Sequence, residues 1–120
     1  MNLQEVKNYC QALPQVEEEL FGPPSNILVY SVKGKKFAYF KTSTPEQWRF
    51  SLRVTPDRFL ELTDQAGIKP ARYMQRFHWI SIVKVGSMDP AYLKELINGS
   101  YAKALSSLPK RVQAEIGAVI

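Results

Sequence analysis

The alternating segment at residues 48–54 constrains the fold most strongly. Large apolar side chains alternate there with polar ones: Trp48, Phe50, Leu52 and Val54 with Arg49, Ser51 and Arg53. Successive side chains of a β-strand point to opposite faces, so this period of two predicts a half-buried antiparallel strand. Both arginines should then lie on the solvent face, roughly 13 Å apart by strand rise. The chain must therefore build a sheet that is covered on one side.

The rest of the chain predicts helices and strands in a definite order. The first half holds a helix from Asn2 to Leu13, a loop or short edge strand over 17–24, strands at 27–32 and 37–40 with a hairpin turn at Lys33–Lys36, and the strand at 48–54. The second half holds a helix from Pro56 to Gly67, one or two strands within 69–85, a helix from Pro90 and a last helix from Pro109. This order contains no βαβ alternation. It predicts one α+β domain, residues 1–120, with an antiparallel sheet and helices packed on one face.

Apolar spacing within the helices predicts which side chains face the core. In the helix that begins at Pro56 these are Phe59, Leu60 and Leu62. Both C-terminal helices are expected to be mostly buried. In the last of them Val112, Ile116 and Val119 fall on one line.

Short motifs follow one another along most of the chain: Lys69-Pro70 with Tyr73, then His78-Trp79, Ser100-Tyr101 and Leu108-Pro109-Lys110. In this order they resemble the motifs of the MmcQ/YjbR-like family. The resemblance implies a frataxin-like (CyaY-like) α+β fold and the double-winged DNA-binding role proposed for that family. It implies no chemistry. The Lys33–Lys36 hairpin resembles one wing, and the sequence offers no equally clear second wing.

Charge is concentrated in the middle of the chain. Residues 33–84 hold eleven bases and four acids, a net of +7, whereas residues 1–32 carry −3 and residues 85–120 carry +1. Such segregation favours a polyanionic partner. The alternative is a basic segment that only solvates one face of the sheet.

Eight basic residues are the candidate nucleic-acid contacts: Lys33, Lys35, Lys36, Arg49, Arg53, Lys69, Arg72 and Arg76. They would bind phosphates, which gives affinity without base readout, and no helix has the composition of a recognition helix. The aromatics Tyr73, Phe77 and Trp79 could stack on unpaired bases, although core packing is more common for such residues. A protein-interaction module that docks an acidic partner is the alternative, and it predicts an exposed apolar patch beside the charges.

Residues typical of catalysis or metal binding are sparse. His78 has no nucleophile or orienting carboxylate at a recognisable spacing, and Cys10 lies on the apolar stripe of the first helix as an inert thiol. A frataxin-type iron site needs a ridge of carboxylates, and here only Glu5 and the run Glu17–Glu19 are available. We therefore expect a non-enzymatic protein without a cofactor or small-molecule substrate. An N-terminus without a secretory pattern and the absence of a long apolar run predict a cytoplasmic protein that does not enter membranes.

Overall fold

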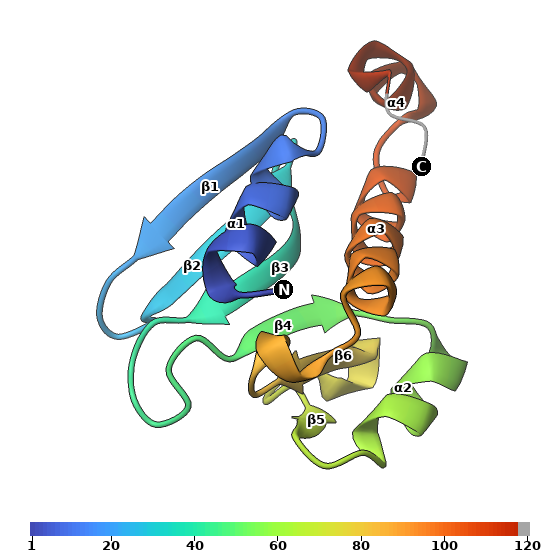
Figure 1. The fold of residues 1–120 in the computed structure, drawn as a ribbon. Coiled ribbons are helices and arrows are strands. Elements are labelled where there is room, and N and C mark those ends of the chain that lie inside the picture. The colour runs from blue at the N-terminus through green and yellow to red at the C-terminus, as the bar shows by residue number, and fades with distance from the viewer. Residues whose placement is uncertain (118–120) are drawn as a thin grey trace.

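Six strands form one antiparallel sheet in the order β1-β2-β3-β4-β6-β5 in the computed structural model, which describes residues 1–117 (Figure 1). The strands are β1 (Val16–Phe21), β2 (Ile27–Val32), β3 (Lys35–Lys41), β4 (Phe50–Arg53), β5 (Ile68–Pro70) and β6 (Trp79–Ile82). The helices are α1 (Leu3–Ala12), α2 (Pro56–Thr63), α3 (Pro90–Ser106) and α4 (Lys110–Ile116), with 3-10 turns η1 (Gln75–Phe77) and η2 (Val85–Ser87). The predicted α+β class with an antiparallel sheet is confirmed.

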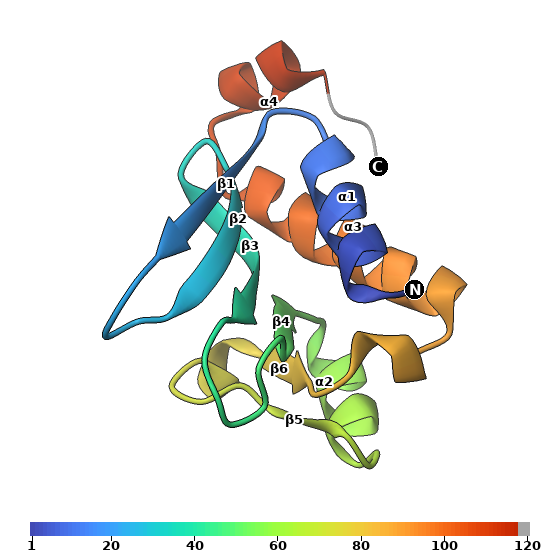
Figure 2. The same cartoon turned by 60° about the vertical axis from the view of Figure 1, so that its left-hand side comes forward.

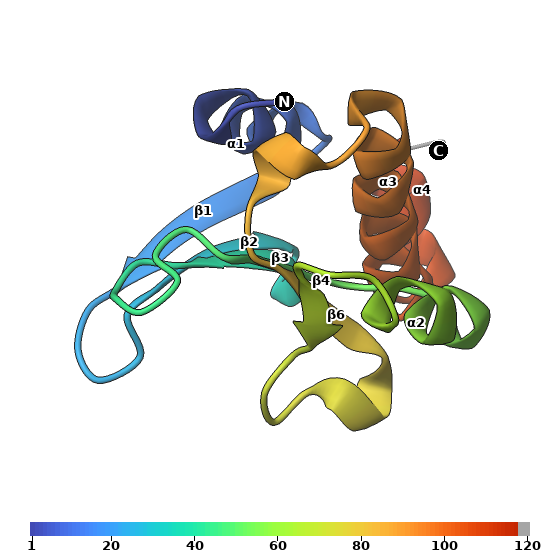
Figure 3. The same ribbon diagram turned by 60° about the horizontal axis from the view of Figure 1, so that its bottom comes forward.

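Helices α1 and α3 lie on the same side of the sheet, whereas α2 lies beside β5 and β6 at its end (Figures 2 and 3). The core fills the space between these helices and the sheet. Its largest fully buried side chains come from β2, β3, β4, β6, α2 and α3, and they include Tyr30, Phe40, Phe50, Leu52, Ile80, Leu93 and Tyr101. Burying this many aromatic and branched side chains supplies the main driving force for folding.

Ser100 and Tyr101 attach α3 to the rest of the fold. The buried Ser100 hydroxyl donates to the Phe37 carbonyl at 2.6 Å and accepts from the Arg53 amide at 3.1 Å, so it bridges β3 and β4. Tyr101 packs edge-on against the Phe37 ring and donates its hydroxyl to the Pro14 carbonyl at 2.6 Å. The Ser-Tyr pair is therefore a structural element in this chain.

The strand predicted over 48–54 is shorter than its alternation suggests. β4 holds only Phe50–Arg53, because Trp48 has a left-handed backbone (φ 69°) that breaks the extended conformation. The Trp48 ring still packs at 6.2 Å from Phe40. β4 is also more than half-buried, since Ser51 is buried on the face away from α1 and α3 and bonds to Ser81 of β6 at 2.7 Å.

Residues 16–21 form the edge strand β1, which is one of the two alternatives predicted over 17–24, and Glu18 in this strand accepts from the Tyr30 hydroxyl at 2.7 Å. Two further expectations differ from the structure. Leu60 is 72 % exposed, because it lies about 100° around α2 from the inward-facing Phe59–Leu62 pair. α4 carries no buried residue, unlike α3, and Val119 lies outside the described residues.

Candidate functional site

Two loops and the last residue of β4 meet at one end of the sheet. β3 and β6 are antiparallel to β4, so the hairpin before β3 and the loop before β6 both lie where β4 ends. Arg53, the last residue of β4, pairs with Trp79 across the ladder and therefore stands between the two loops. We call this region the basic sheet end: the β2–β3 hairpin (33–36), Arg53 and the β5–β6 loop (71–78).

The β2–β3 hairpin is a tight two-residue turn. Lys33 (φ 49°) and Gly34 (φ 81°) are both left-handed, the conformation that matches the twist of the flanking strands. Lys33, Lys35 and Lys36 are all exposed. The Lys36 ammonium lies over the stacked rings of Tyr39 and Trp79, 5.1 and 5.7 Å from their centroids, and the resulting partial desolvation lowers its pKa.

The β5–β6 loop presents arginines and aromatics together. Arg72 lies 5.0 Å from the centroid of the Tyr73 ring, and Arg76 lies 4.8 Å from that of Phe77. Tyr73 is 80 % exposed and Phe77 42 % exposed, whereas the third predicted stacking residue, Trp79, is buried in the sheet. In Figure 3 the loop extends away from the face that carries α1 and α3. The loop lies at the same end of the sheet as the β2–β3 hairpin, although the two segments are far apart in the sequence.

The remaining two predicted residues, Arg49 and Lys69, form a separate cluster. Both pair with Glu46: Arg49 at 2.9 Å, in a short i−3 contact, and Lys69 at 2.7 Å. The hydrogen bond from Lys69 and then the bond and charge of Arg49 lower the pKa of the Glu46 carboxyl, so it is ionised at neutral pH. The Arg49 Nε is buried without a hydrogen-bond partner. Arg49 is therefore paired and mostly buried, with 20 % of its side chain exposed, whereas the strand pattern had predicted it on the solvent face together with Arg53.

Lys103 of α3 is an additional basic residue at this site. It lines two adjoining hollows together with Arg53, although sequence analysis gave it no role because it lies 50 residues further along the chain. Of the ion pairs among residues 1–117, none involves Arg53, Lys103 or the cations of the two loops. The basic sheet end and Lys103 therefore concentrate positive charge that no carboxylate of residues 1–117 neutralises.

The Cys10 thiol and the His78 imidazole both pack against apolar surroundings. Cys10 is fully buried in α1, and desolvation, followed by the charge of Glu18, raises its pKa to about 12. His78 is part-buried with its ring edge-on to Phe59 at 5.6 Å.

Within residues 1–117 no three His, Cys, Asp or Glu side chains gather as metal ligands would. In the same part of the chain no helix combines the length and apolar character that a membrane span requires.

The fold and the basic sheet end define a small α+β protein whose most distinctive surface is cationic. A family model described as YjbR matches residues 11–103, and the chain belongs to the YjbR family. The uncharacterized protein YjbR of Escherichia coli K12 is 25 % identical over 111 residues, which cover 92 % of each chain.

Solved structures agree with this assignment. The crystal structure of a Deinococcus radiodurans protein with a DUF419 domain matches with a TM-score of 0.83 and 26 % identity, covering 98 % of this chain and 89 % of that one. A Pseudomonas syringae protein matches with a TM-score of 0.68 and 20 % identity, over 87 % of this chain and 99 % of the other, and supports the fold alone.

Proposed function

We propose that this protein is a non-enzymatic binding protein that contacts the backbone of nucleic acids through the basic sheet end. One observation carries the proposal. The β2–β3 hairpin and the β5–β6 loop lie at the same end of the sheet and flank Arg53, and none of their cations pairs with a carboxylate in the part of the chain that the structure describes. Phosphates bind to such an arrangement through charge and hydrogen bonds, without reading bases.

The β5–β6 loop adds a preference for single strands. Tyr73 and Phe77 are exposed beside Arg72 and Arg76, and unpaired bases stack on exposed aromatic rings with about 1–3 kcal/mol per base. Bases inside a duplex are not available for such stacking. We therefore expect single-stranded DNA or RNA to bind more tightly than duplex of the same length.

Fluorescence anisotropy with labelled single-stranded and duplex oligonucleotides of mixed sequence tests the proposal. Five phosphate contacts, from Lys35, Lys36, Arg53, Arg72 and Arg76, predict a log–log salt slope of about −4.5 for duplex and about −3.5 for single strands. The double variants Lys35→Gln/Lys36→Gln and Arg72→Gln/Arg76→Gln should each weaken binding and reduce the slope by about 1.5.

The double variant Arg49→Gln/Lys69→Gln is the matched control. It also removes two positive charges, but both cations are paired with Glu46 and lie outside the basic sheet end, so it should weaken binding less than either of the other double variants. Absence of binding at low salt, or an equal loss in all three double variants, would reject the basic sheet end as a nucleic-acid site.

An acidic protein partner is the second candidate. The same exposed Tyr73 and Phe77 form apolar surface beside the arginines, which is what such a partner would require. Substituting Tyr73 and Phe77 by Ser separates the two functions. A nucleic-acid site should keep its duplex affinity and lose its single-strand preference, whereas a protein site should lose its aromatic anchors and most of its affinity.

A further inference from the structure

Two hollows, which we call the groove, lie along α3 beside the basic sheet end and share Arg53 and Lys103 in their linings. The first hollow has a volume of about 730 Å³ and lies between α3 and the β4–α2 junction. The second has a volume of about 530 Å³ and lies between the C-terminal half of α3 and the β2–β3 hairpin. Arg53 and Lys103 line both hollows, so a ligand lying across the junction would contact both cations.

The two hollows differ in chemistry. The second is polar and cationic, because Lys35, Lys36, Ser106 and Ser107 line it together with the shared pair. The first has an apolar floor and wall, formed by Val54, Pro56, Leu96, Gly99 and Ala102. Its volume is in the range of pockets that enclose most of a small organic molecule.

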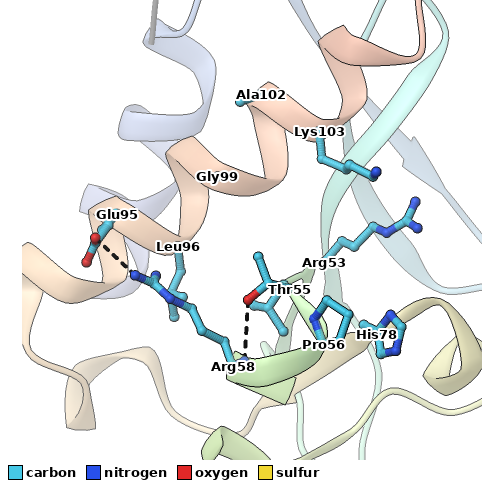
Figure 4. A pocket seen from close by; sticks show the side chains of 11 residues that line it. Arg53, Thr55, Pro56, Arg58, His78, Glu95, Leu96, Gly99, Ala102 and Lys103 are labelled. Atoms are coloured by element: carbon cyan, nitrogen blue, oxygen red, sulfur yellow. Dashed lines mark hydrogen bonds and ion pairs between the residues drawn. The ribbon is translucent and has the colours of Figure 1, made fainter. Parts of the chain in front are cut away.

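Polar groups limit the first hollow at its ends. Figure 4 shows Arg53 and Lys103 extending toward the same space at one end, while Arg58 and Glu95 pair at 3.1 Å at the other. The Arg58–Glu95 pair neutralises itself. The charge available to a ligand is therefore positive and lies where the two hollows join.

Gly99 in the middle of α3 leaves the floor of the first hollow open. A Cβ atom at this position would meet no other atom within 4 Å, so packing within the protein does not require glycine here. Glycine weakens a helix interior relative to alanine, because the unfolded chain loses more freedom. Gly99 thus costs stability and borders a hollow beside Arg53 and Lys103. A glycine at such a position allows a ligand to approach the helix backbone closely.

We propose that this groove binds a small phosphate monoester with an apolar body. The phosphate lies at Arg53 and Lys103 on the side of Lys35 and Lys36, where the planar guanidinium can bind two oxygens at once. The apolar body lies over Gly99 and Ala102 against Val54 and Pro56. This inference goes beyond the nucleic-acid contact, because it concerns a small molecule and a groove surface on α3 that the two loops do not form.

Amide chemical shifts in a ¹H–¹⁵N NMR titration test the proposal. Adenosine monophosphate and decyl phosphate carry the same phosphate group, one on a nucleoside and the other on an alkyl chain. Adenosine lacks the phosphate, and inorganic phosphate lacks the organic body. At least one ester should shift the Gly99 and Ala102 amides, with about tenfold or greater affinity over adenosine and over phosphate. The ester that binds more tightly identifies the source of the ligand as nucleotide or lipid-like.

Variants locate the site. Lys103→Gln and Arg53→Gln should each weaken the ester about fivefold or more, while Lys84→Gln and Arg111→Gln, which alter exposed cations outside both hollows, should not. Gly99→Leu should fill the first hollow and abolish the shifts at Ala102, with a melting temperature at or above that of the wild type.

Unchanged Gly99 and Ala102 amides with both esters would overturn the proposal. Equal affinity for phosphate alone would overturn the role of the apolar hollow. Both results are independent of oligonucleotide binding, which the Arg72→Gln/Arg76→Gln variant measures separately because neither residue lines a hollow.

Discussion

The two ends of β4 hold chemically similar arginines in opposite ways. At the start, the Arg49 side chain is fixed by Glu46, which also pairs with Lys69, so both cations have a carboxylate partner although the cluster keeps a net charge of +1. At the end, Ser100 fixes the backbone amide of Arg53 and leaves its guanidinium without a carboxylate partner among residues 1–117. Arg49 therefore serves the fold and Arg53 remains available for a ligand. A basic residue indicates a binding site only when its neighbours leave the charge free.

The largest expected effect comes from removing the Ser100 hydroxyl. Ser100→Ala leaves the Phe37 carbonyl and the Arg53 amide without a buried partner, so we expect a loss of about 2–3 kcal/mol in unfolding free energy. Urea denaturation followed by circular dichroism measures it. Ser106→Ala is the control on the same helix, because its exposed bond to the Lys103 carbonyl should matter little. Equal stability of the two variants would contradict the bridging role of Ser100.

Single substitutions at the two ends of β4 test the contrast directly. Arg53→Gln should weaken oligonucleotide binding about tenfold, equivalent to about 1.4 kcal/mol, because a free cation at the centre of the site is lost. Arg49→Gln should change it less than about twofold. Anisotropy titrations at one salt concentration provide both values, and a larger effect at Arg49 would reverse the assignment.

Gly99→Ala is expected to stabilise the protein. The added methyl group meets open space, and alanine favours the helix interior by about 0.5–1 kcal/mol over glycine. Denaturant midpoints of the variant and wild type measure this gain. A loss of stability would mean that Gly99 serves packing and would remove one argument for a ligand above it.

Glu46→Gln should give the smallest effect. It releases Arg49 and Lys69 from their shared carboxylate, so oligonucleotide affinity should rise about two- to threefold at pH 7. The folded-state pKa of Glu46 is lowered, so its contribution to stability is present above the ordinary glutamate pKa and is lost as the pH falls through the folded value. Melting temperatures of the wild type and variant should therefore differ at neutral pH and converge in acid. A difference in melting temperature that stays constant from neutral pH to acid would show that the ionised Glu46 carboxylate is not the source of the stabilisation.

Most of the secondary structure was predictable from local patterns. Alternation, capping residues and the Lys33–Lys36 turn located the helices and strands, and the charge distribution located the basic segment. The errors are also local in origin. The apolar alternation of 48–54 persists where Trp48 turns the backbone, and the helical spacing of Leu60 gives no indication that only the Phe59–Leu62 side of α2 has a partner.

The site depended on contacts between distant residues. The eight predicted basic residues divide into the basic sheet end and the Glu46 cluster, and no spacing rule separates them, because Lys69 reaches Glu46 across 23 positions. Lys103 and the groove likewise require α3 to lie beside β4 and the β2–β3 hairpin.

The sequence by itself determined the class of fold, the family motifs and the positive middle of the chain, because these follow from side-chain periodicity and composition. Only the tertiary structure decided which cations remain free, that two loops share one end of the sheet and that α3 borders a groove. Charge neutralisation and cavity shape depend on distances of a few ångströms between residues far apart in the chain, and a linear pattern does not encode those distances locally.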